Sequence, residues 1–170
     1  TCADLFFQSS LINAAEDCLS MIAEATKNKN TVVVVGLPVN IGNSLYNCSV
    51  AVYDGDILGA VPKTYIPNYG EYYEKRWFKS GKDLKGGIAL CSQSVPVGTN
   101  LLFAAEGIEN FTFGIEICED LWAPIPPSSY LTMSGAAIIA NTSASNELAT
   151  KNEYRTALVS NQSARCICGY

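Results

Sequence analysis

The first regular pattern along the chain is a helical spacing of apolar residues near its start. Between residues 10 and 26, apolar or small side chains recur every three to four positions, at Leu11, Ala14, Ala15, Cys18, Ile22 and Ala25. Positions with this spacing lie on one face of a helix, so an amphipathic helix is predicted over 10–26. Ser9 or Ser10 is expected to be its N-cap, because a serine hydroxyl accepts a hydrogen bond from the free N–H groups of the first turn.

A β-branched run follows the polar residues 27–30. Residues 31–35 read Thr-Val-Val-Val-Val, without alternation of polar and apolar positions. Such a run predicts a strand that is covered on both faces. Gly36 and Pro38 are expected to end this strand.

The rest of the chain alternates between predicted strands and helices. Further strands are expected at 45–53, 57–61, 100–104, 111–117 and 136–140. Two further helices are expected, one opened by 126–128 and closed by Gly135, the other at 152–165. Residues 54–56 and 106–107 supply the turns of two hairpins. Strands and helices that alternate in this way predict one α/β domain in which helices cover sheets.

The composition narrows the class of protein. Of 170 residues, 48% are hydrophobic and 16% are charged, which is typical of a folded domain. The formal net charge is −5 and no run of Lys or Arg occurs, so neither a nucleic acid nor a membrane is expected as a partner. The longest apolar stretches are far shorter than the ~20 residues needed to span a bilayer. No signal segment opens the chain, and a cytoplasmic location is expected.

Two residue types limit the chemistry that the chain can perform. It contains no histidine, which excludes Cys-His and Ser-His nucleophile pairs and zinc sites with a histidine ligand. Lys, Glu, Asp, Tyr or Cys must therefore carry any catalysis. The seven cysteines are odd in number and scattered, without a Cys-x-x-Cys pair. They are expected to be reduced and mostly buried, and no metal site is expected.

Cys118 is the strongest candidate nucleophile. It follows the predicted strand 111–117 and precedes the turn into the helix that opens at 126–128. A nucleophile on a sharp strand-to-helix turn is exposed, and the next backbone N–H can face a developing oxyanion. Its spacing alone also fits a buried structural cysteine. Thr1, an N-terminal threonine whose own amine could act as base, is a second candidate that Cys118 outranks.

Lys63 also follows the end of a predicted strand, directly after Pro62. Functional residues of α/β proteins gather where strands end. An ammonium group beside a thiol favours the thiolate, so in a chain without histidine Lys63 is a natural partner for Cys118. We expect the two side chains to meet across one cleft. Considered alone, Lys63 also fits an ordinary surface lysine.

The longest irregular stretch, 64–87, is rich in aromatic and charged residues and is a candidate functional loop. Glu71 and Glu74 are candidate acid–base or substrate-holding carboxylates, and the tyrosines around them are candidates to line a pocket. The alternative is a solvated loop with ion pairs among Glu74, Lys75 and Arg76.

Three segments together resemble the nitrilase, or carbon–nitrogen hydrolase, superfamily. They read GAVPKTYIP at 59–67, YGEYYEKR at 69–76 and GIEICEDLW at 114–122. The resemblance implies an α/β fold, an α-β-β-α layered sandwich, and a Glu-Lys-Cys triad. The segments PIPPS at 124–128 and ANTSAS at 140–145 are similar to one subgroup, the glutamine amidase domains of glutamine-dependent NAD synthetases.

The resemblance also implies roles for individual residues. It makes Cys118 the nucleophile, Lys63 its cationic partner, and Glu71 the second glutamate, which positions substrate or water. The residues that it places against the substrate, glutamine, are Tyr69, Glu119, Ser145 and Lys151, with the backbone N–H of Glu119 in the oxyanion site. The implied reaction hydrolyses the side-chain amide of glutamine through a cysteine thioester and releases ammonia.

The resemblance further implies that residues 1–170 are part of a longer enzyme, incomplete at both ends. The general-base glutamate is expected upstream of Thr1, so this piece alone is expected to be inactive or nearly so. No cofactor is expected in it. ATP and magnesium are expected in the synthetase domain, which would use the ammonia to amidate deamido-NAD. That domain and a second copy of the chain, in a homo-oligomer, are the expected protein partners.

Two other functions fit the same residues. One is a stand-alone nitrilase-type amidase that acts on another amide. The other is a non-catalytic, nitrilase-like subunit used for assembly, which the missing base favours and the presence of both Lys63 and Cys118 disfavours.

Overall fold

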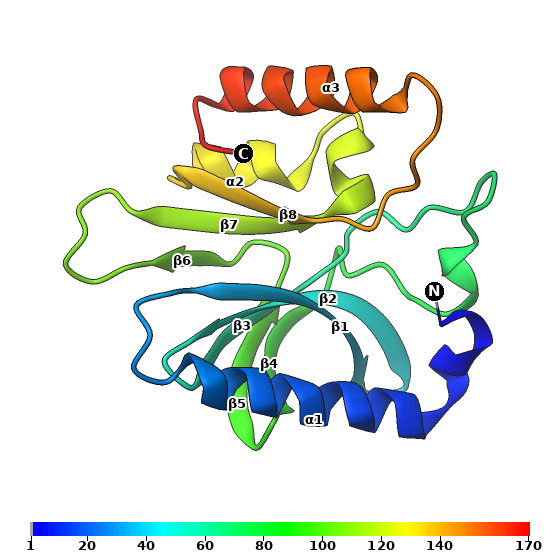
Figure 1. The fold of residues 1–170 in the computed structure, drawn as a ribbon, viewed down its shortest axis with the longest axis vertical. Helices are drawn as coiled ribbons and strands as arrows, with labels where there is room; N and C mark the ends of the chain where they lie inside the picture. The colour runs from blue at the N-terminus through cyan, green and yellow to red at the C-terminus, as the bar shows by residue number, and fades with distance from the viewer. Residues whose placement is uncertain (1) are drawn as a thin grey trace.

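The computed structural model describes residues 2–170, and Thr1, the second candidate nucleophile, lies outside the described residues. The chain forms four layers in the order helix, sheet, sheet, helix (Figure 1). Helix α1 (Ser9–Thr26) packs on the outer side of the larger sheet. Helices α2 (Pro127–Met133) and α3 (Lys151–Cys166) lie on the outer side of the smaller one. The expected α-β-β-α sandwich is confirmed.

The larger sheet, called sheet A here, has the strand order β1-β2-β3-β5-β4. Its strands are β1 (Val33–Ile41), β2 (Ser44–Tyr53), β3 (Asp56–Pro62), β4 (Lys85–Leu90) and β5 (Gln93–Gly98). Neighbouring strands are antiparallel except β3 and β5, which are parallel. Between these two parallel strands, the chain leaves the sheet after β3, forms a long loop and then returns to the same sheet.

The smaller sheet, sheet B, has the order β6-β7-β8. Its strands are β6 (Leu102–Ala104), β7 (Thr112–Ile117) and β8 (Ile138–Thr142). Strands β7 and β8 are parallel, and the crossover between them contains α2. Three 3-10 helices complete the chain, η1 (Ala3–Phe7), η2 (Glu74–Arg76) and η3 (Cys118–Trp122).

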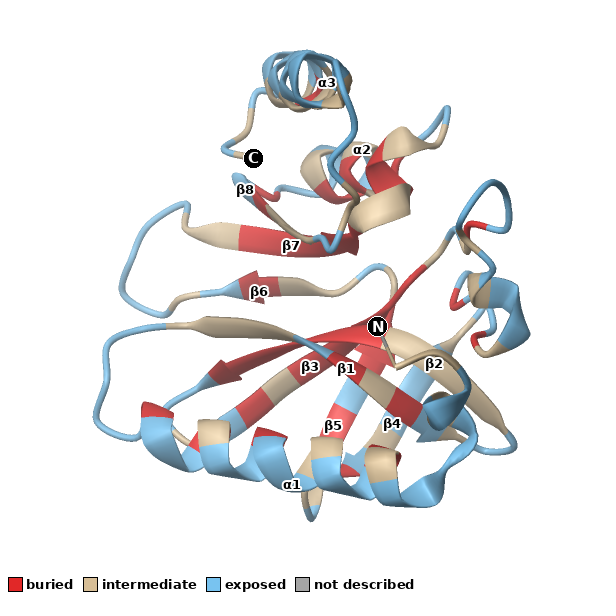
Figure 2. Ribbon diagram, turned by 45° about the vertical axis from the view of Figure 1, so that its right-hand side comes forward, coloured by how far each residue is buried: buried red, intermediate tan, exposed pale blue. Residues whose placement is uncertain are grey.

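Sheet A is covered on both faces, which explains its continuous apolar runs (Figure 2). Residues Val50 and Val52 of β2 pack with Leu19 and Ala23 of α1. The intervening Ala51 belongs to a second cluster, which lies between the sheets and includes Val61, Phe103, Phe113 and Ile115. Successive residues of a strand point to opposite faces, so both faces of β2 must be apolar. The valine run is only partly buried, although its side chains pack on both faces: Val35 contacts the α1 side and Val34 the cluster between the sheets.

The expected end of the first strand at Gly36 and Pro38 is wrong. Strand β1 continues to Ile41, and Pro38 lies opposite Asn47 of β2. Because β1 is at the edge of sheet A, the N–H that proline lacks is not needed by a further strand. A proline at a sheet edge is therefore compatible with the strand.

Two other expectations differ from the structure. Helix α1 begins at Ser9 after Gln8, and no side chain caps it, so neither Ser9 nor Ser10 is the N-cap. The β4–β5 hairpin was not predicted, because the β4 sequence KGGIAL has two glycines and β5 contains Pro96. Both features lower the apparent strand propensity of this hairpin.

The expectation that most cysteines are buried is also wrong. Only Cys48 is fully buried, in β2, and burial raises the pKa of its thiol to about 12. Cys18 is exposed on α1, and the other five are partly accessible. All seven are free thiols.

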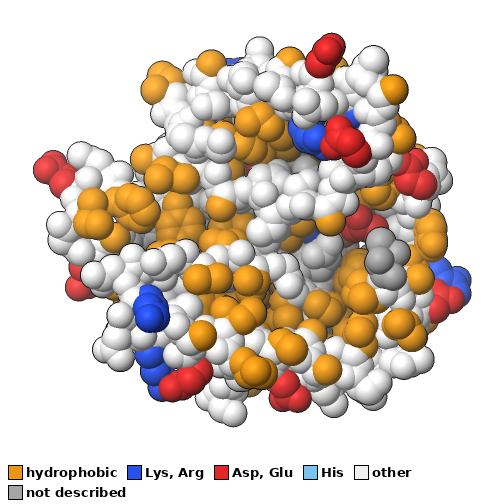
Figure 3. Space-filling view, viewed as in Figure 1, with side chains coloured by type: hydrophobic (Ala, Val, Ile, Leu, Met, Phe, Trp, Pro, Cys, Tyr) orange, Lys and Arg blue, Asp and Glu red, His pale blue; other side chains and the backbone are white. Residues whose placement is uncertain are grey.

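On the face shown in Figure 3, hydrophobic side chains cover broad areas, and basic groups occur singly or in small groups. None of the helices within residues 2–170 is both long and apolar enough to cross a membrane.

We predict that Gly81→Ala destabilises the fold by about 1–3 kcal/mol, the usual cost of overpacking a buried site. An added Cβ would lie 2.4 Å from the Cβ of Pro62 and 3.2 Å from its carbonyl carbon, so backbone would have to move. Urea unfolding measures the effect. Gly87→Ala is the matched control, since the nearest atom to its new Cβ is 3.9 Å away. Equal losses of stability in the two variants would contradict the prediction.

Candidate active site

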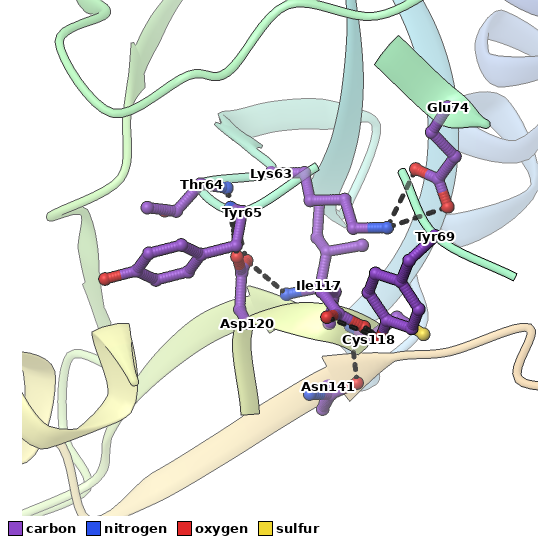
Figure 4. Close-up of polar contacts among 10 residues, drawn as sticks. Lys63, Thr64, Tyr65, Tyr69, Glu74, Ile117, Cys118, Asp120 and Asn141 are labelled. Atoms are coloured by element: carbon purple, nitrogen blue, oxygen red, sulfur yellow. Dashed lines mark hydrogen bonds and ion pairs between the residues drawn. The ribbon is translucent and has the colours of Figure 1, made fainter. Parts of the chain in front are cut away.

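Ends of strands from both sheets meet in one region of the molecule (Figure 4). Lys63 follows β3 of sheet A, and Cys118 follows β7 of sheet B. Strands β3 and β7 pack against each other between the layers, and β8 lies beside β7. The segments that leave β3, β7 and β8 are therefore brought together although they are far apart in the sequence.

Lys63 is almost completely buried, with 1% of its surface exposed. Its backbone is held on both sides, since its N–H donates to the carbonyl of Asn47 at 2.7 Å and its carbonyl accepts from the N–H of Gly81 at 2.8 Å. Its ammonium Nζ donates to both carboxylate oxygens of Glu74, at 3.0 and 2.8 Å. A buried charge is tolerated only when it is paired, so Glu74 is what keeps a cation at this position.

The structure places Glu74, not Glu71, beside Lys63. Glu74 lies in η2, whereas the exposed Glu71 accepts a hydrogen bond from the side-chain amide of Asn146. The ion pairs considered among Glu74, Lys75 and Arg76 are not formed; Arg76 instead binds Asp4 at 2.6 Å. Both glutamates are candidates from the sequence. They are three residues apart, and the turn of η2 brings Glu74, not Glu71, to Lys63.

Cys118 stands at a sharp turn, as expected. It is the first residue of η3 directly after β7, and its φ is +45°. Few non-glycine residues adopt this left-handed conformation, because Cβ is crowded by the backbone. The backbone N–H of Cys118 donates to Oδ1 of Asn141 at 2.9 Å. Its side chain is partly accessible and not sealed in the core, so a buried structural cysteine is not what the structure contains.

Lys63, Glu74 and Cys118 line one cavity of about 280 Å³. The other lining residues are Gly36, Asn47, Ile117, Thr142, Ser143 and Ala144. Lys63 and Cys118 therefore line one cleft, and direct contact between the amine and the sulfur stays a prediction. A second cavity of about 280 Å³ reaches Cys118 from the side of α3 and is lined by Trp122, Val159 and Tyr170 among others.

The carboxylate of Asp120 joins the Lys63 and Cys118 segments. One oxygen accepts the backbone N–H groups of Thr64 and Tyr65, at 3.1 and 2.8 Å, and the other accepts that of Ile117 at 3.0 Å. These donors are the two residues after Lys63 and the residue before Cys118. Burial raises the pKa of Asp120 to about 6, although the three N–H groups lower it. At neutral pH the carboxylate is thus mostly charged and accepts all three.

Tyr69 and Glu119, both predicted to contact substrate, contact each other. The Tyr69 hydroxyl donates to both carboxylate oxygens of Glu119, at 2.8 and 2.9 Å. Burial, followed by the neighbouring Glu119, raises the pKa of Tyr69 to about 12. The two side chains line a cavity of about 760 Å³, together with Tyr65 and Trp122. They lie next to Cys118, because Glu119 is the residue that follows it.

The other two predicted substrate contacts come from the segment after β8. Ser145 is half-buried, one residue beyond Ala144 of the Cys118 cavity. Lys151 begins α3 and places its ammonium 5.5 Å from the ring centre of Trp122 and 5.9 Å from that of Tyr72. It also donates to the side-chain carbonyl of Asn146, the residue whose amide binds Glu71.

Asp120 and Asn141 have clear structural roles. The sequence analysis predicts no role for either residue, although both belong to motifs that it names. The signal for Asp120 was its place two residues after a nucleophile at a strand end, where a short acidic side chain reaches backbone N–H groups. No comparable local signal exists for Asn141, because its partner Cys118 is 23 residues away.

Comparison with known proteins shows the family to which the chain belongs. The carbon–nitrogen hydrolase family matches residues 3–166 of the chain. The glutamine-dependent NAD(+) synthetase of Mycobacterium tuberculosis is 38% identical over 167 residues, which are 98% of this chain and 25% of that protein. That of Thermotoga maritima is 34% identical over 143 residues, 84% of this chain and 21% of that protein. The chain thus spans about a quarter of the length of these curated relatives.

Solved structures agree with this result. A glutamine-dependent NAD(+) synthetase from Cytophaga hutchinsonii aligns with a TM-score of 0.83 and 28% identity, covering 98% of this chain and 26% of that one. A carbon–nitrogen hydrolase from Helicobacter pylori aligns with a TM-score of 0.63 and 19% identity, covering 95% of this chain and 50% of that one, and supports the fold alone.

The raised pKa of Asp120 predicts how stability depends on pH. The pKa is about 6 in the folded protein against an ordinary value of 3.8, so the folded state binds this proton more tightly than the unfolded state. The contribution is complete below about pH 4 and is lost as the pH rises through about 6, a change on the order of 3 kcal/mol. Asp120→Asn lacks this titration.

Urea unfolding between about pH 4 and pH 7 checks this dependence. The free energy of unfolding of the wild type minus that of Asp120→Asn is expected to fall across this range. The control is Asp83→Asn, at an exposed position, for which the difference should stay flat. A difference that is flat, or that rises, for Asp120 would contradict the assignment.

Proposed function

Because this chain belongs to the carbon–nitrogen hydrolase family, we propose that it is the amide-cleaving part of a glutamine-dependent enzyme, with Cys118 as nucleophile. The observation that carries the proposal is the cavity in which the buried, Glu74-paired ammonium of Lys63 and the thiol of Cys118 face the same space. An ammonium group in that position is placed to stabilise negative charge that develops in the cavity during the reaction.

In the proposed reaction, the Cys118 thiolate attacks the side-chain amide carbon of glutamine. A carbon–sulfur bond forms, and the amide oxygen becomes an oxyanion. The Lys63 ammonium and the backbone N–H of Glu119 stabilise it, a contribution of about 3–4 kcal/mol per donor in other enzymes. Glu119 is the second residue of η3, and the first N–H groups of a helix have no acceptor within the helix.

Collapse of the oxyanion breaks the carbon–nitrogen bond and releases ammonia, which takes up a proton as it leaves. Water then attacks the thioester, its hydroxyl remaining on the carbon and its proton returning to the sulfur, and glutamate is released. Glu74 is held by Lys63 through both oxygens, so we assign the proton transfers to another acid. We propose that this acid belongs to a part of the enzyme outside residues 1–170.

Glutamine is the substrate that the surrounding charges favour. Its α-ammonium and α-carboxylate groups need an anion and a cation near the nucleophile, and Glu119 and Lys151 provide one of each. Tyr69 and Ser145 are the neutral hydrogen-bonding groups proposed to complete the contacts. Glu71 is proposed to position the substrate from the outer loop, through the contact that it makes with Asn146.

The relatives named glutamine-dependent NAD(+) synthetase are about four times as long as this chain. We propose that the ammonia is used by a synthetase domain of the same kind, which would amidate deamido-NAD with ATP and magnesium. Within residues 2–170, no group of three Cys, Asp or Glu side chains is arranged to hold a metal ion. We propose that magnesium is bound with ATP in that other domain.

We predict that a chloroketone analogue of L-glutamine alkylates Cys118 before any other thiol, with loss of chloride. The reason is that the Cys118 thiol is partly accessible, shares its cavity with the Lys63 ammonium and lies in the proposed glutamine site. Peptide mapping by mass spectrometry locates the label, and L-glutamine is expected to slow the labelling whereas D-glutamine is not. Cys118→Ser should abolish it. Faster labelling of the exposed Cys18 would contradict the proposal, and iodoacetamide provides the comparison of unspecific reactivity.

A second prediction separates the two candidate glutamates. Glu74→Gln is expected to slow the labelling of Cys118 by about tenfold, because Lys63 loses the carboxylate that fixes its buried ammonium at this cavity. Glu71→Gln keeps the Lys63–Glu74 pair. It is expected to raise the reagent concentration that gives half of the maximal labelling rate and to leave the maximal labelling rate unchanged. The dependence of labelling rate on reagent concentration measures both. The opposite pattern would assign the role of Glu74 to Glu71.

A further inference from the structure

Cys118 has an unfavourable backbone conformation, and side chains bind the two peptide N–H groups that lead into it, those of Ile117 and Cys118. A left-handed residue other than glycine costs about 1–2 kcal/mol and persists where its surroundings fix it. The N–H of Ile117 donates to Asp120, and the N–H of Cys118 donates to Oδ1 of Asn141 at 2.9 Å. Asn141 is thus the one acceptor recorded for the nucleophile's own N–H within residues 2–170.

A chain of hydrogen bonds leads from Asn141 into the layer beneath sheet B. The Nδ2 group of Asn141 donates to the hydroxyl of Tyr170 at 2.9 Å. The Tyr170 hydroxyl in turn donates to Oε1 of Glu116. The second oxygen of Glu116 accepts the backbone N–H of Ser128, in the first turn of α2, at 2.7 Å. Glu116 is 1% exposed and lies in β7, two residues before Cys118.

Glu116 is the buried end of this chain of hydrogen bonds, and its carboxylate determines which group donates and which accepts in each bond. A carboxylate only accepts hydrogen bonds, so both Ser128 and Tyr170 must donate to Glu116. Tyr170 has a single proton, and once that proton is used, its oxygen can only accept. Asn141 must therefore turn its amide NH₂ toward Tyr170, which leaves its carbonyl oxygen toward Cys118. Burial, followed by the charge of Glu116, raises the pKa of Tyr170 and keeps this proton in place.

We propose that Glu116 is a positioning residue, which fixes the orientation of the Asn141 amide through Tyr170 and thereby holds the Cys118 backbone in its left-handed conformation. The inference rests on the proposed role of Cys118 as nucleophile. Glu116 does not contact the Cys118 cavity, whose lining residues include Ile117 and Cys118 but not Glu116. Glu116 acts on the nucleophile indirectly, because it determines which group donates and which accepts in each hydrogen bond between them.

Glu116→Gln is expected to reverse the donors and acceptors along this chain of hydrogen bonds, while the shape of the side chain stays almost the same. The Ser128 N–H retains the new amide oxygen as its acceptor, so the amide NH₂ faces Tyr170. The Tyr170 proton must then go to Asn141, whose amide turns over and presents NH₂ to the N–H of Cys118. The double variant Glu116→Gln with Asn141→Asp restores the bond, because the new carboxylate accepts from both Tyr170 and Cys118. A role in packing alone predicts no such rescue.

The readout is amide hydrogen exchange of the full chain, measured by NMR at Cys118 and Ser128. Glu116→Gln is expected to speed exchange at Cys118 by about fivefold, which corresponds to the loss of one neutral hydrogen bond, and the double variant is expected to reverse it. Glu153→Gln, an exposed position in the first turn of α3, is the matched control and should change neither amide. Faster exchange at Ser128 with Cys118 unchanged would overturn the proposal, as would absence of rescue.

Tyr170→Phe provides an independent variant should Glu116→Gln fail to fold. It keeps the ring and removes the oxygen that orients Asn141, so exchange at Cys118 should rise in the same way, while unchanged exchange would overturn the proposal. Alkylation of Cys118 by iodoacetamide, which requires no glutamine site, is expected to slow in parallel. The exchange experiment thus gives its answer even when the glutamine analogue fails to label Cys118, which would reject the proposed function alone.

Discussion

The buried carboxylate of Asp120 is the interaction on which the arrangement of the site depends. Sheet A carries Lys63 and sheet B carries Cys118, and the two sheets are joined mainly by apolar contacts. Apolar packing is not directional, so by itself it leaves the two strand ends free to shift. Three hydrogen bonds to one carboxylate fix the backbone after Lys63 and before Cys118 relative to each other.

The absence of histidine explains why so much of the site consists of buried charge. A histidine can act beside a thiol as a neutral base. In the proposed site the partner of the thiol is a lysine cation, and a buried cation needs an anion. Glu74 meets that need from η2. The turn that carries Glu74 is in turn held by Asp4, which binds Arg76 at 2.6 Å and the indole N–H of Trp77 at 3.0 Å. Residues remote in sequence are thus needed to keep a single ammonium group in place.

The features that the sequence predicted well are those encoded by neighbouring residues. The helix α1 and the strand ends before Lys63 and Cys118 depend on local patterns, and these were found. The predicted apolar face of α1 was wrong: the helix buries Ile12, Leu19, Ala23 and Thr26, and the predicted positions Ala14, Cys18 and Ala25 are exposed. The extension of β1 through Pro38 was not predictable in this way, because it depends on β1 being at the edge of its sheet. The choice of Glu74 over Glu71 and the contact of Asn141 with Cys118 also depend on how distant segments come together. These are tertiary contacts, which periodicity and propensity do not contain.

The left-handed backbone of Cys118 costs stability, so the proposed nucleophile is at a position where a reactive side chain makes the chain less stable. A glycine at this position would relieve the crowding of Cβ, and the strain is a property of the site and not of the sulfur. Selection of variants for heat resistance alone would therefore tend to discard the reactive group first. In this fold, durability and reactivity are opposed at a single residue.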